Sequence, residues 1–112
     1  MIRAIFAIHH LGLRFMSKVI FRVSYSIADG KRADFLAAIA NVRAFYAGTE
    51  IGFILCETKG KHNHFQEVYT FPTPEAYEAS DDPEATAPIS GAIEKIYSLA
   101  KDVVYDVASE VA

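Results

Sequence analysis

The chain has 112 residues, of which 52% are hydrophobic and 22% are charged, so it is long enough for one domain with a substantial core but too short for two. Its single cysteine excludes an internal disulfide and a four-cysteine zinc site, and it favours a reducing cytoplasm. The net charge of −3 argues against nucleic acid as a partner, and no apolar run approaches the ~18 residues of a membrane span.

Residues 1–15 differ in composition from the rest of the chain. They carry two arginines, two histidines and no acidic residue, whereas the remainder has nine basic and fourteen acidic residues. His9 and His10 interrupt the apolar stretch that a secretory signal needs, and the serines of a transit peptide are missing. We expect an N-terminal extension here, produced by a start codon upstream of Met16 or forming a peripheral segment, with residues 16–112 as a single domain.

The first two predicted elements are a strand and a helix. Residues 19–27 place apolar side chains at every odd position, which is typical of a strand with one strongly apolar face. Apolar residues then recur at helical spacing between residues 35 and 46. Asp29 is placed to cap the start of this helix, and Gly48 to end it in the left-handed conformation.

Two further strands are predicted to form a hairpin. Residues 51–58 are rich in β-prone residues and apolar on both parities, which predicts a strand buried on both faces. Cys56, within this strand, is expected to be a small buried hydrophobe. A polar turn with one glycine leads to a second alternating strand over residues 65–71.

The last third of the chain predicts a short helix, a longer helix and a closing strand. Thr73 followed by Pro74 is a typical helix start, and this helix covers about residues 75–80. Helical spacing of apolar residues resumes near Pro88. Residues 102–111 have the composition of a strand.

The order β-α-β-β-α-β predicts an α+β, ferredoxin-like fold, in which two helices cover one face of an antiparallel four-stranded sheet. The closing strand nevertheless offers valines to both faces, Val107 to one and Val104 to the other. Apolar sheet faces of that size are rare on monomers. We therefore expect a homodimer, or a higher homo-oligomer, in which a second copy covers the open face.

In this element order, the segment FQEVY at residues 65–69 and the run PEAYEA at residues 74–79 resemble the antibiotic biosynthesis monooxygenase family. The resemblance covers about residues 18–111 and implies a dimeric α/β barrel. It also implies a cofactor-independent monooxygenase, in which a small aromatic or quinol-type substrate itself supplies the electrons to oxygen. Tyr69 stands where the family often has Trp, and Ser80 where it often has His. The chain has no Trp, which argues against the haem-degrading branch of the family.

Glu67 is the candidate catalytic residue. It shares the parity of the three aromatic residues of its strand, so it enters the apolar layer if they face the helices. Burial there would raise its pKa, which suits a general base or an acceptor for a phenol, and the carboxyl could bond a tyrosine such as Tyr25. The alternatives are an ion pair with Arg22 or Arg43, or a place near the strand end where the carboxylate reaches water.

Six tyrosines and eight phenylalanines are enough to line a flat pocket for an aromatic or quinone-like molecule between sheet and helices. The alternative is a well-filled core. The substrate-pocket candidates are Phe21, Tyr25, Phe45, His64, Tyr69, Phe71 and Tyr77.

His62 and His64 form a His-x-His pair at the start of the third strand, where i and i+2 point to one side and could meet a metal ion. The nearest acidic residue in the strand, Glu67, has the opposite parity to His64. We therefore favour a solvated turn, and no metal or other cofactor is expected.

Three classes of function remain open. They are an oxygenase or isomerase of a small aromatic compound, a non-catalytic binding protein that uses the same pocket, and a self-assembly module. An enzyme needs at least two polar groups that converge in the pocket, such as Glu67 with Tyr25 or His64, whereas an assembly module needs a filled cleft.

Overall fold

The computed structural model describes residues 17–111, so the predicted extension at residues 1–15 lies outside the described part. The elements in chain order are β1 (Val19–Ile27), η1 (Asp29–Lys31), α2 (Arg32–Ala47), β2 (Gly52–Glu57), β3 (His64–Phe71), α3 (Pro74–Ala79), η2 (Pro83–Ile89), α4 (Ser90–Leu99) and β4 (Ala100–Ser109), where η marks a 3₁₀ helix. No helix within residues 17–111 is long and apolar enough to cross a membrane.

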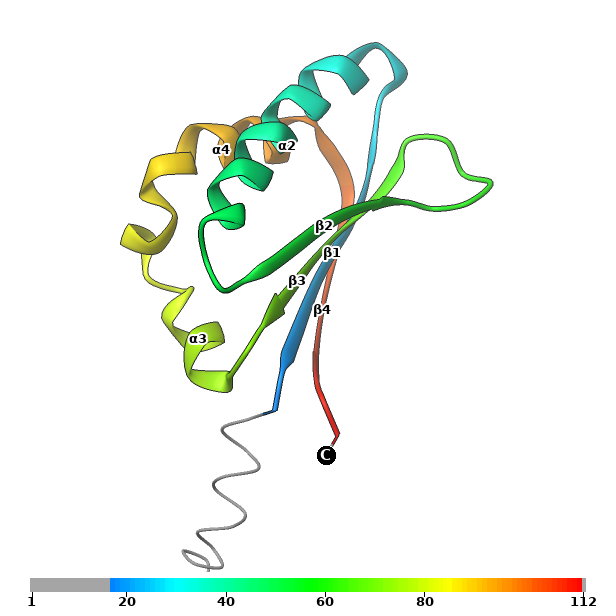
Figure 1. The fold of residues 1–112 in the computed structure, drawn as a ribbon. Helices are drawn as coiled ribbons and strands as arrows, with labels where there is room; N and C mark the ends of the chain where they lie inside the picture. The colour runs from blue at the N-terminus through cyan, green and yellow to red at the C-terminus, as the bar shows by residue number, and fades with distance from the viewer. Residues whose placement is uncertain (1–16, 112) are drawn as a thin grey trace, which may run out of the picture.

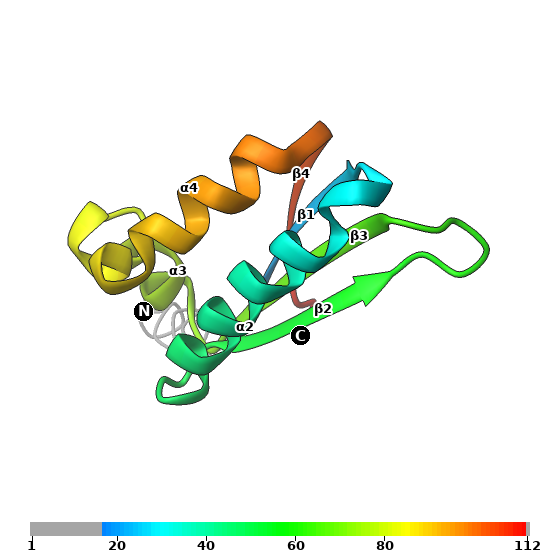
Figure 2. The same cartoon turned by 90° about the horizontal axis from the view of Figure 1, so that it is seen from above.

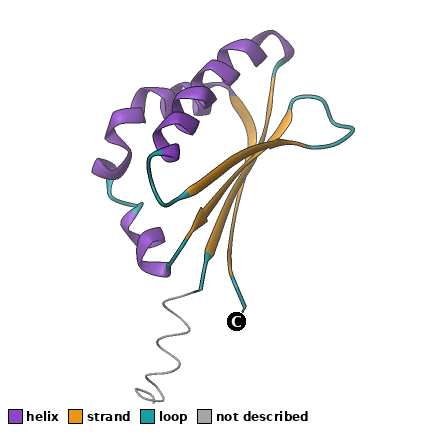
Figure 3. Cartoon of the chain, viewed as in Figure 1, coloured by secondary structure: helices purple, strands orange, loops and turns teal. Residues whose placement is uncertain are grey.

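The four strands form one antiparallel sheet in the order β2-β3-β1-β4. Helices α2 and α4 lie side by side on one face of this sheet, with the short α3 at one end of the same layer (Figure 1). Figure 2 shows the two long helices from above, and Figure 3 shows that no helix covers the opposite face of the described sheet. The predicted α+β, ferredoxin-like arrangement is confirmed.

The core lies between the sheet and helices α2 and α4. Phe35, on α2, is fully buried and packs its ring 4.6 Å from that of Phe65 on β3 and 5.6 Å from that of Tyr25 on β1. The helical spacing predicted from sequence is what turns these side chains inward. The other fully buried side chains of the core are Val23, Ile39 and Val42.

Both predicted ends of α2 are wrong in detail. Asp29 does not cap the helix, because it lies in η1, where its carboxylate bonds the side chain of Asn63 instead. Gly48 has φ of −92°, outside the left-handed region, and its N–H bonds the carbonyl of Phe45 at 3.3 Å. A tightened last turn therefore ends the helix without a left-handed residue.

The prediction that the second strand is buried on both faces is also wrong for the single chain. β2 is an edge strand, and its Ile54 side points away from the helices, where no second layer from residues 17–111 covers it. Ile54 is 56% exposed, and Cys56, two residues along on the same side, is exposed rather than buried. The inward side chains, such as Phe53 and Leu55, are half-buried under α2.

The face of the sheet that lies opposite the helices is called the outer face here. Strand register places Ile54 beside Val68, and Val104 beside Ser24, on this face. Val104 is 62% exposed and Val68 is half-buried. The described part of the chain therefore leaves apolar side chains open on the outer face, as the sequence predicts, although the same face also carries the ion pair between Arg22 and Asp106.

Candidate functional site

A cavity of about 190 Å³ lies between the sheet and the three α-helices. Its wall combines the inward side chains of β1 and β3 with residues of α2, α3, α4 and the turn after α3. An enclosed apolar cavity of about 150 Å³ can hold a benzene molecule, so this one encloses one ring. It is open to solvent on one side, where a second fused ring can extend. Its lining residues are Phe21, Val42, Tyr46, Glu67, Tyr69, Phe71, Tyr77, Ser80, Asp81, Ile93, Ile96 and Tyr97.

Glu67 forms the polar centre of this cavity. The alternation of β3 turns it inward between Phe65 and Phe71, and it is only 2% exposed. Its Oε2 accepts a hydrogen bond from Tyr25 Oη, and its Oε1 accepts one from Tyr69 Oη at 2.5 Å. The predicted bond to Tyr25 is confirmed, and neither the ion pair nor the exposed position that the sequence left open is found.

Burial is the main influence on the ionisation of Glu67. It raises the pKa of the carboxyl above its ordinary value, because the charged form loses its hydration. The hydrogen bonds from Tyr25 and Tyr69 favour the charged form and act in the opposite direction. A carboxyl in this position can take up or release a proton closer to neutral pH than an exposed one.

The tyrosines around Glu67 are held in their protonated form. Burial raises the pKa of Tyr25 and Tyr69, and the negative charge of Glu67 raises both further. Burial and the same carboxylate also raise the pKa of Tyr46 and Tyr97. These hydroxyls can therefore act as hydrogen-bond donors, and they cannot replace Glu67 as the base.

Aromatic rings form much of the cavity wall. The ring centroid of Tyr77 lies 5.3 Å from that of Phe71 and 6.4 Å from that of Phe21. Phe21 in turn lies 5.8 Å from Tyr69 and stacks on Tyr105 of β4 at 6.0 Å. Walls of this kind suit a flat aromatic ligand.

The structure brings most of the predicted pocket residues together. Phe21, Tyr69, Phe71 and Tyr77 line the same cavity as Glu67. Tyr25 is buried in the core, 3% exposed, and reaches the site only through its hydrogen bond to Glu67.

Two predicted pocket residues lie elsewhere. Phe45 lines a separate depression of about 130 Å³ beside the end of α2. His64 is exposed at the start of β3, where register pairs it with Ser26 on the outer face. It therefore cannot join Glu67, which points to the opposite face of the same strand.

The cavity includes polar residues that the sequence did not single out for it. Tyr97 comes from α4, Asp81 from the turn after α3, and Ser80 from the end of α3. The Ser80 hydroxyl is engaged, because its Oγ donates to the carbonyl oxygen of Tyr77 at 2.5 Å. For Tyr97 a signal existed, since it shares the helical spacing of Ile93 and Ile96, which line the same cavity.

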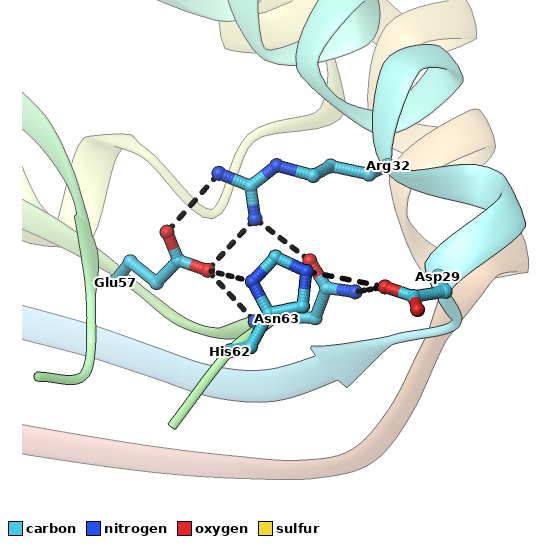
Figure 4. Close-up of polar contacts among 5 residues, drawn as sticks. All are labelled: Asp29, Arg32, Glu57, His62 and Asn63. Carbon is cyan, nitrogen blue, oxygen red and sulfur yellow. Dashed lines mark hydrogen bonds and ion pairs between the residues drawn. The ribbon is translucent and has the colours of Figure 1, made fainter. Parts of the chain in front are cut away.

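Of the predicted His-x-His pair, only His62 belongs to a second cluster, at the hairpin between β2 and β3 (Figure 4). Arg32 donates to both carboxylate oxygens of Glu57, at 2.7 and 3.1 Å, and to Oδ1 of Asn63 at 2.7 Å. His62 is exposed and lies 3.1 Å from Asp29. Within residues 17–111 no group of three or more potential ligands could hold a metal ion. The hydrogen bonds of Arg32 and Asp29 tie the hairpin to η1 and the start of α2.

No family model matches the chain, and no curated protein does either. Several solved structures, however, are similar to the structure of this chain. The chain is similar to a "putative antibiotic biosynthesis monooxygenase" from Caulobacter crescentus, with a TM-score of 0.74 at 15% identity over 93% of this chain and 99% of that one. It is also similar to SnoaB, a cofactor-independent oxygenase from Streptomyces nogalater, with a TM-score of 0.64 at 18% identity over 86% of this chain and 95% of that one.

A third similar structure is a conserved protein of unknown function from Bacteroides thetaiotaomicron, described as a possible oxidoreductase. Its TM-score is 0.70 at 18% identity, over 84% of this chain and 98% of that one. At such identities the likeness establishes a shared fold. The resemblance to the antibiotic biosynthesis monooxygenases, first drawn from residues 65–79, is thus confirmed for the fold.

Proposed function

We propose that the protein is a cofactor-independent oxygenase of a small aromatic or quinol-type molecule. The observation that carries this proposal is the buried Glu67 carboxyl, which faces a ring-lined cavity and is held by two tyrosine hydroxyls. The fold shared with SnoaB adds support. A carboxyl with a raised pKa beside space for one or two rings provides a base for a phenolic hydroxyl.

The proposed reaction begins with proton transfer from the substrate hydroxyl to Glu67. The pKa of a simple phenol is about 10. The raised pKa of Glu67 brings the pKa values of base and substrate closer together, so the proton transfer is less unfavourable. The resulting phenolate is electron-rich and is oxidised by molecular oxygen. One oxygen atom forms a carbonyl at the ring carbon opposite the hydroxyl, where the C–H bond breaks. The other oxygen atom leaves as water with that hydrogen and the proton held by Glu67, so the hydroxyarene becomes a quinone and the carboxylate is restored.

Tyr25 and Tyr69 position the base in this proposal. Each bonds one carboxylate oxygen, so the carboxyl plane is held while each oxygen keeps a lone pair for the substrate. The aromatic wall made by Phe21, Phe71 and Tyr77 holds the ring of the substrate in the cavity.

The proposed active form is a homodimer that covers the outer face. Ile54 and Val104 are both more than half exposed there, on different strands of one sheet. An open apolar sheet surface is costly in water, and a second copy related by a two-fold axis buries the same surface twice. Two sheets packed in this way make the dimeric α/β barrel that the resemblance implies.

Oxygen uptake tests the proposed reaction. The full-length protein is mixed with 1-naphthol or with single-ring phenols that have hydrogen opposite the hydroxyl in an oxygen electrode, against protein-free and boiled-protein controls. We expect at least one compound to consume one O₂ per quinone formed, in proportion to protein concentration. Binding of these compounds without oxygen uptake would contradict the oxygenase and favour a binding protein.

A further inference from the structure

The charged side chains that line the cavity are all acidic within the described chain. They are Glu67 at its centre and Asp81, which is exposed, in the turn after α3. The other lining residues are hydrophobic or carry a hydroxyl group, and none of them is a lysine, an arginine or a histidine.

Two arginines, Arg22 on β1 and Arg32 at the start of α2, are engaged elsewhere. Arg22 points to the outer face and pairs with Asp106 at 2.5 Å. Arg32 is held by Glu57 at the far end of the hairpin. Neither guanidinium lines the cavity, so neither is placed to neutralise an anion bound there.

The hydrogen-bond donors nearest to Glu67 are also committed. Tyr25 and Tyr69 both donate to its carboxylate. An anionic ligand would therefore bring a second negative charge beside a buried one, without a cation and without these two donors. The faces of the surrounding rings carry negative electrostatic potential, which disfavours an anion further and favours a cation.

We infer that the cavity selects its ligand by charge: it takes aromatic alcohols and amines that are neutral or positively charged, and it rejects rings that carry a carboxylate or sulfonate. This inference rests on the proposed function in taking the cavity as the substrate site. It also agrees with the proposed reaction. When a neutral phenol transfers its proton to Glu67, the negative charge moves from the carboxylate to the phenolate, and the total charge in the cavity stays the same.

Binding of three naphthalenes that differ in one substituent tests the inference. The ligands are 1-naphthol, 1-naphthoate and protonated 1-naphthylmethylamine, titrated into the full-length protein by calorimetry near neutral pH under argon, so that no turnover occurs. We expect 1-naphthoate to bind about 10-fold or more weakly than 1-naphthol, and the ammonium compound to bind at least as well as 1-naphthol. Equal affinity for 1-naphthoate and 1-naphthol, or no binding of any of the three, would overturn the inference.

Two matched variants test whether the negative charge of Asp81 contributes to the charge selectivity of the cavity. Asp81→Asn removes the exposed charge at the cavity and should improve the affinity for 1-naphthoate, relative to that for 1-naphthol, several-fold. Asp82→Asn is the control, because Asp82 does not line the cavity and asparagine can keep its cap on the Glu84 N–H. An equal effect of the two variants on 1-naphthoate would contradict a role for the cavity wall.

The oxygen-uptake experiment separates this inference from the proposed reaction. Selective binding of 1-naphthol without any oxygen uptake would leave the charge selection standing and remove the oxygenase. Oxygen uptake that is equally fast with carboxylated and uncarboxylated naphthols would remove the charge selection and leave the oxygenase.

Discussion

Tyr69 donates a hydrogen bond to Glu67 across 2.5 Å, although the two residues are only two positions apart on one strand. Side chains at i and i+2 of a strand share a face, so β3 provides both the carboxyl and one of its donors. The second donor, Tyr25, comes from the neighbouring strand β1. Two central strands thus fix the carboxyl and contribute Phe21 and Phe71 to the cavity wall, which the helices and the turn after α3 complete.

Loss of the Tyr69 hydroxyl should change the pH dependence of turnover. The hydrogen bond from Tyr69 favours the charged carboxylate, so Tyr69→Phe should raise the pKa of Glu67 further. The acidic limb of kcat against pH should then move to higher pH, with activity retained on the alkaline side. Tyr77→Phe is the control, because Tyr77 lines the cavity without affecting the pKa of Glu67. An unchanged acidic limb in Tyr69→Phe would show that Glu67 does not control the reaction.

The ion pair between Arg32 and Glu57 should make stability depend on pH in the acidic range. The Arg32 hydrogen bond, with the bond from the Asn63 N–H, lowers the pKa of Glu57 from its ordinary 4.5 to about 2. Because this pKa is lowered by folding, the stabilisation is present above the ordinary value and is lost as pH falls toward about 2. Arg32→Met should therefore lower Tm at neutral pH, and the difference from wild type should shrink as the pH falls.

Thermal unfolding followed by circular dichroism between about pH 2 and pH 7 measures this effect. Arg43→Met, an exposed position on the same helix, is the matched control and should leave Tm within a few degrees at every pH. A constant Tm difference between Arg32→Met and wild type over the whole range would mean that packing, such as Arg32 over the ring of Phe65 at 5.3 Å, outweighs the ion pair.

A charge on the outer face should disrupt the proposed dimer. Of the two valines considered from sequence, Val104 faces away from the helices, whereas register places Val107 beside the inward Phe21. Wild type should sediment at about twice the chain mass of 12.4 kDa. Val104→Lys should sediment as a monomer or aggregate, because a lysine cannot be buried unpaired between two sheets.

Ala44→Lys, on an exposed position of α2, is the control for this experiment and should keep the wild-type mass. A wild-type monomer at micromolar concentration would contradict the dimer, since the open apolar face would then have no cover.

Strand periodicity explains how much of the site was predictable. Alternation over residues 65–71 is enough to put Glu67 on the same face as Phe65 and Phe71, and the structure agrees. The same alternation assigns His64 to the opposite face, so its inclusion among the pocket residues was an error that the pattern itself could correct.

The parts that sequence could not predict depend on how distant elements pack. Phe45 and Tyr46 are neighbours on α2 and both are aromatic, but the placement of the helix over the sheet sends only Tyr46 to the main cavity. Asp81 reaches the cavity because a turn follows α3, which no periodicity describes. Asp29 could have capped α2, but its carboxylate instead accepts a hydrogen bond from the side-chain amide of Asn63, 34 residues away in sequence.

The kinetics of Glu67→Gln test the central claim, that Glu67 is the base of an oxygenase, most directly. Glutamine keeps the shape and one acceptor oxygen, and it removes a carboxylate whose ionisation burial disfavours, so Tm and the affinity for 1-naphthol should stay close to wild type. Oxygen uptake per protein should fall by roughly 10²-fold or more, the scale of a general base. A variant that keeps wild-type turnover, or one that loses turnover only in proportion to a loss of folded protein, would contradict the account.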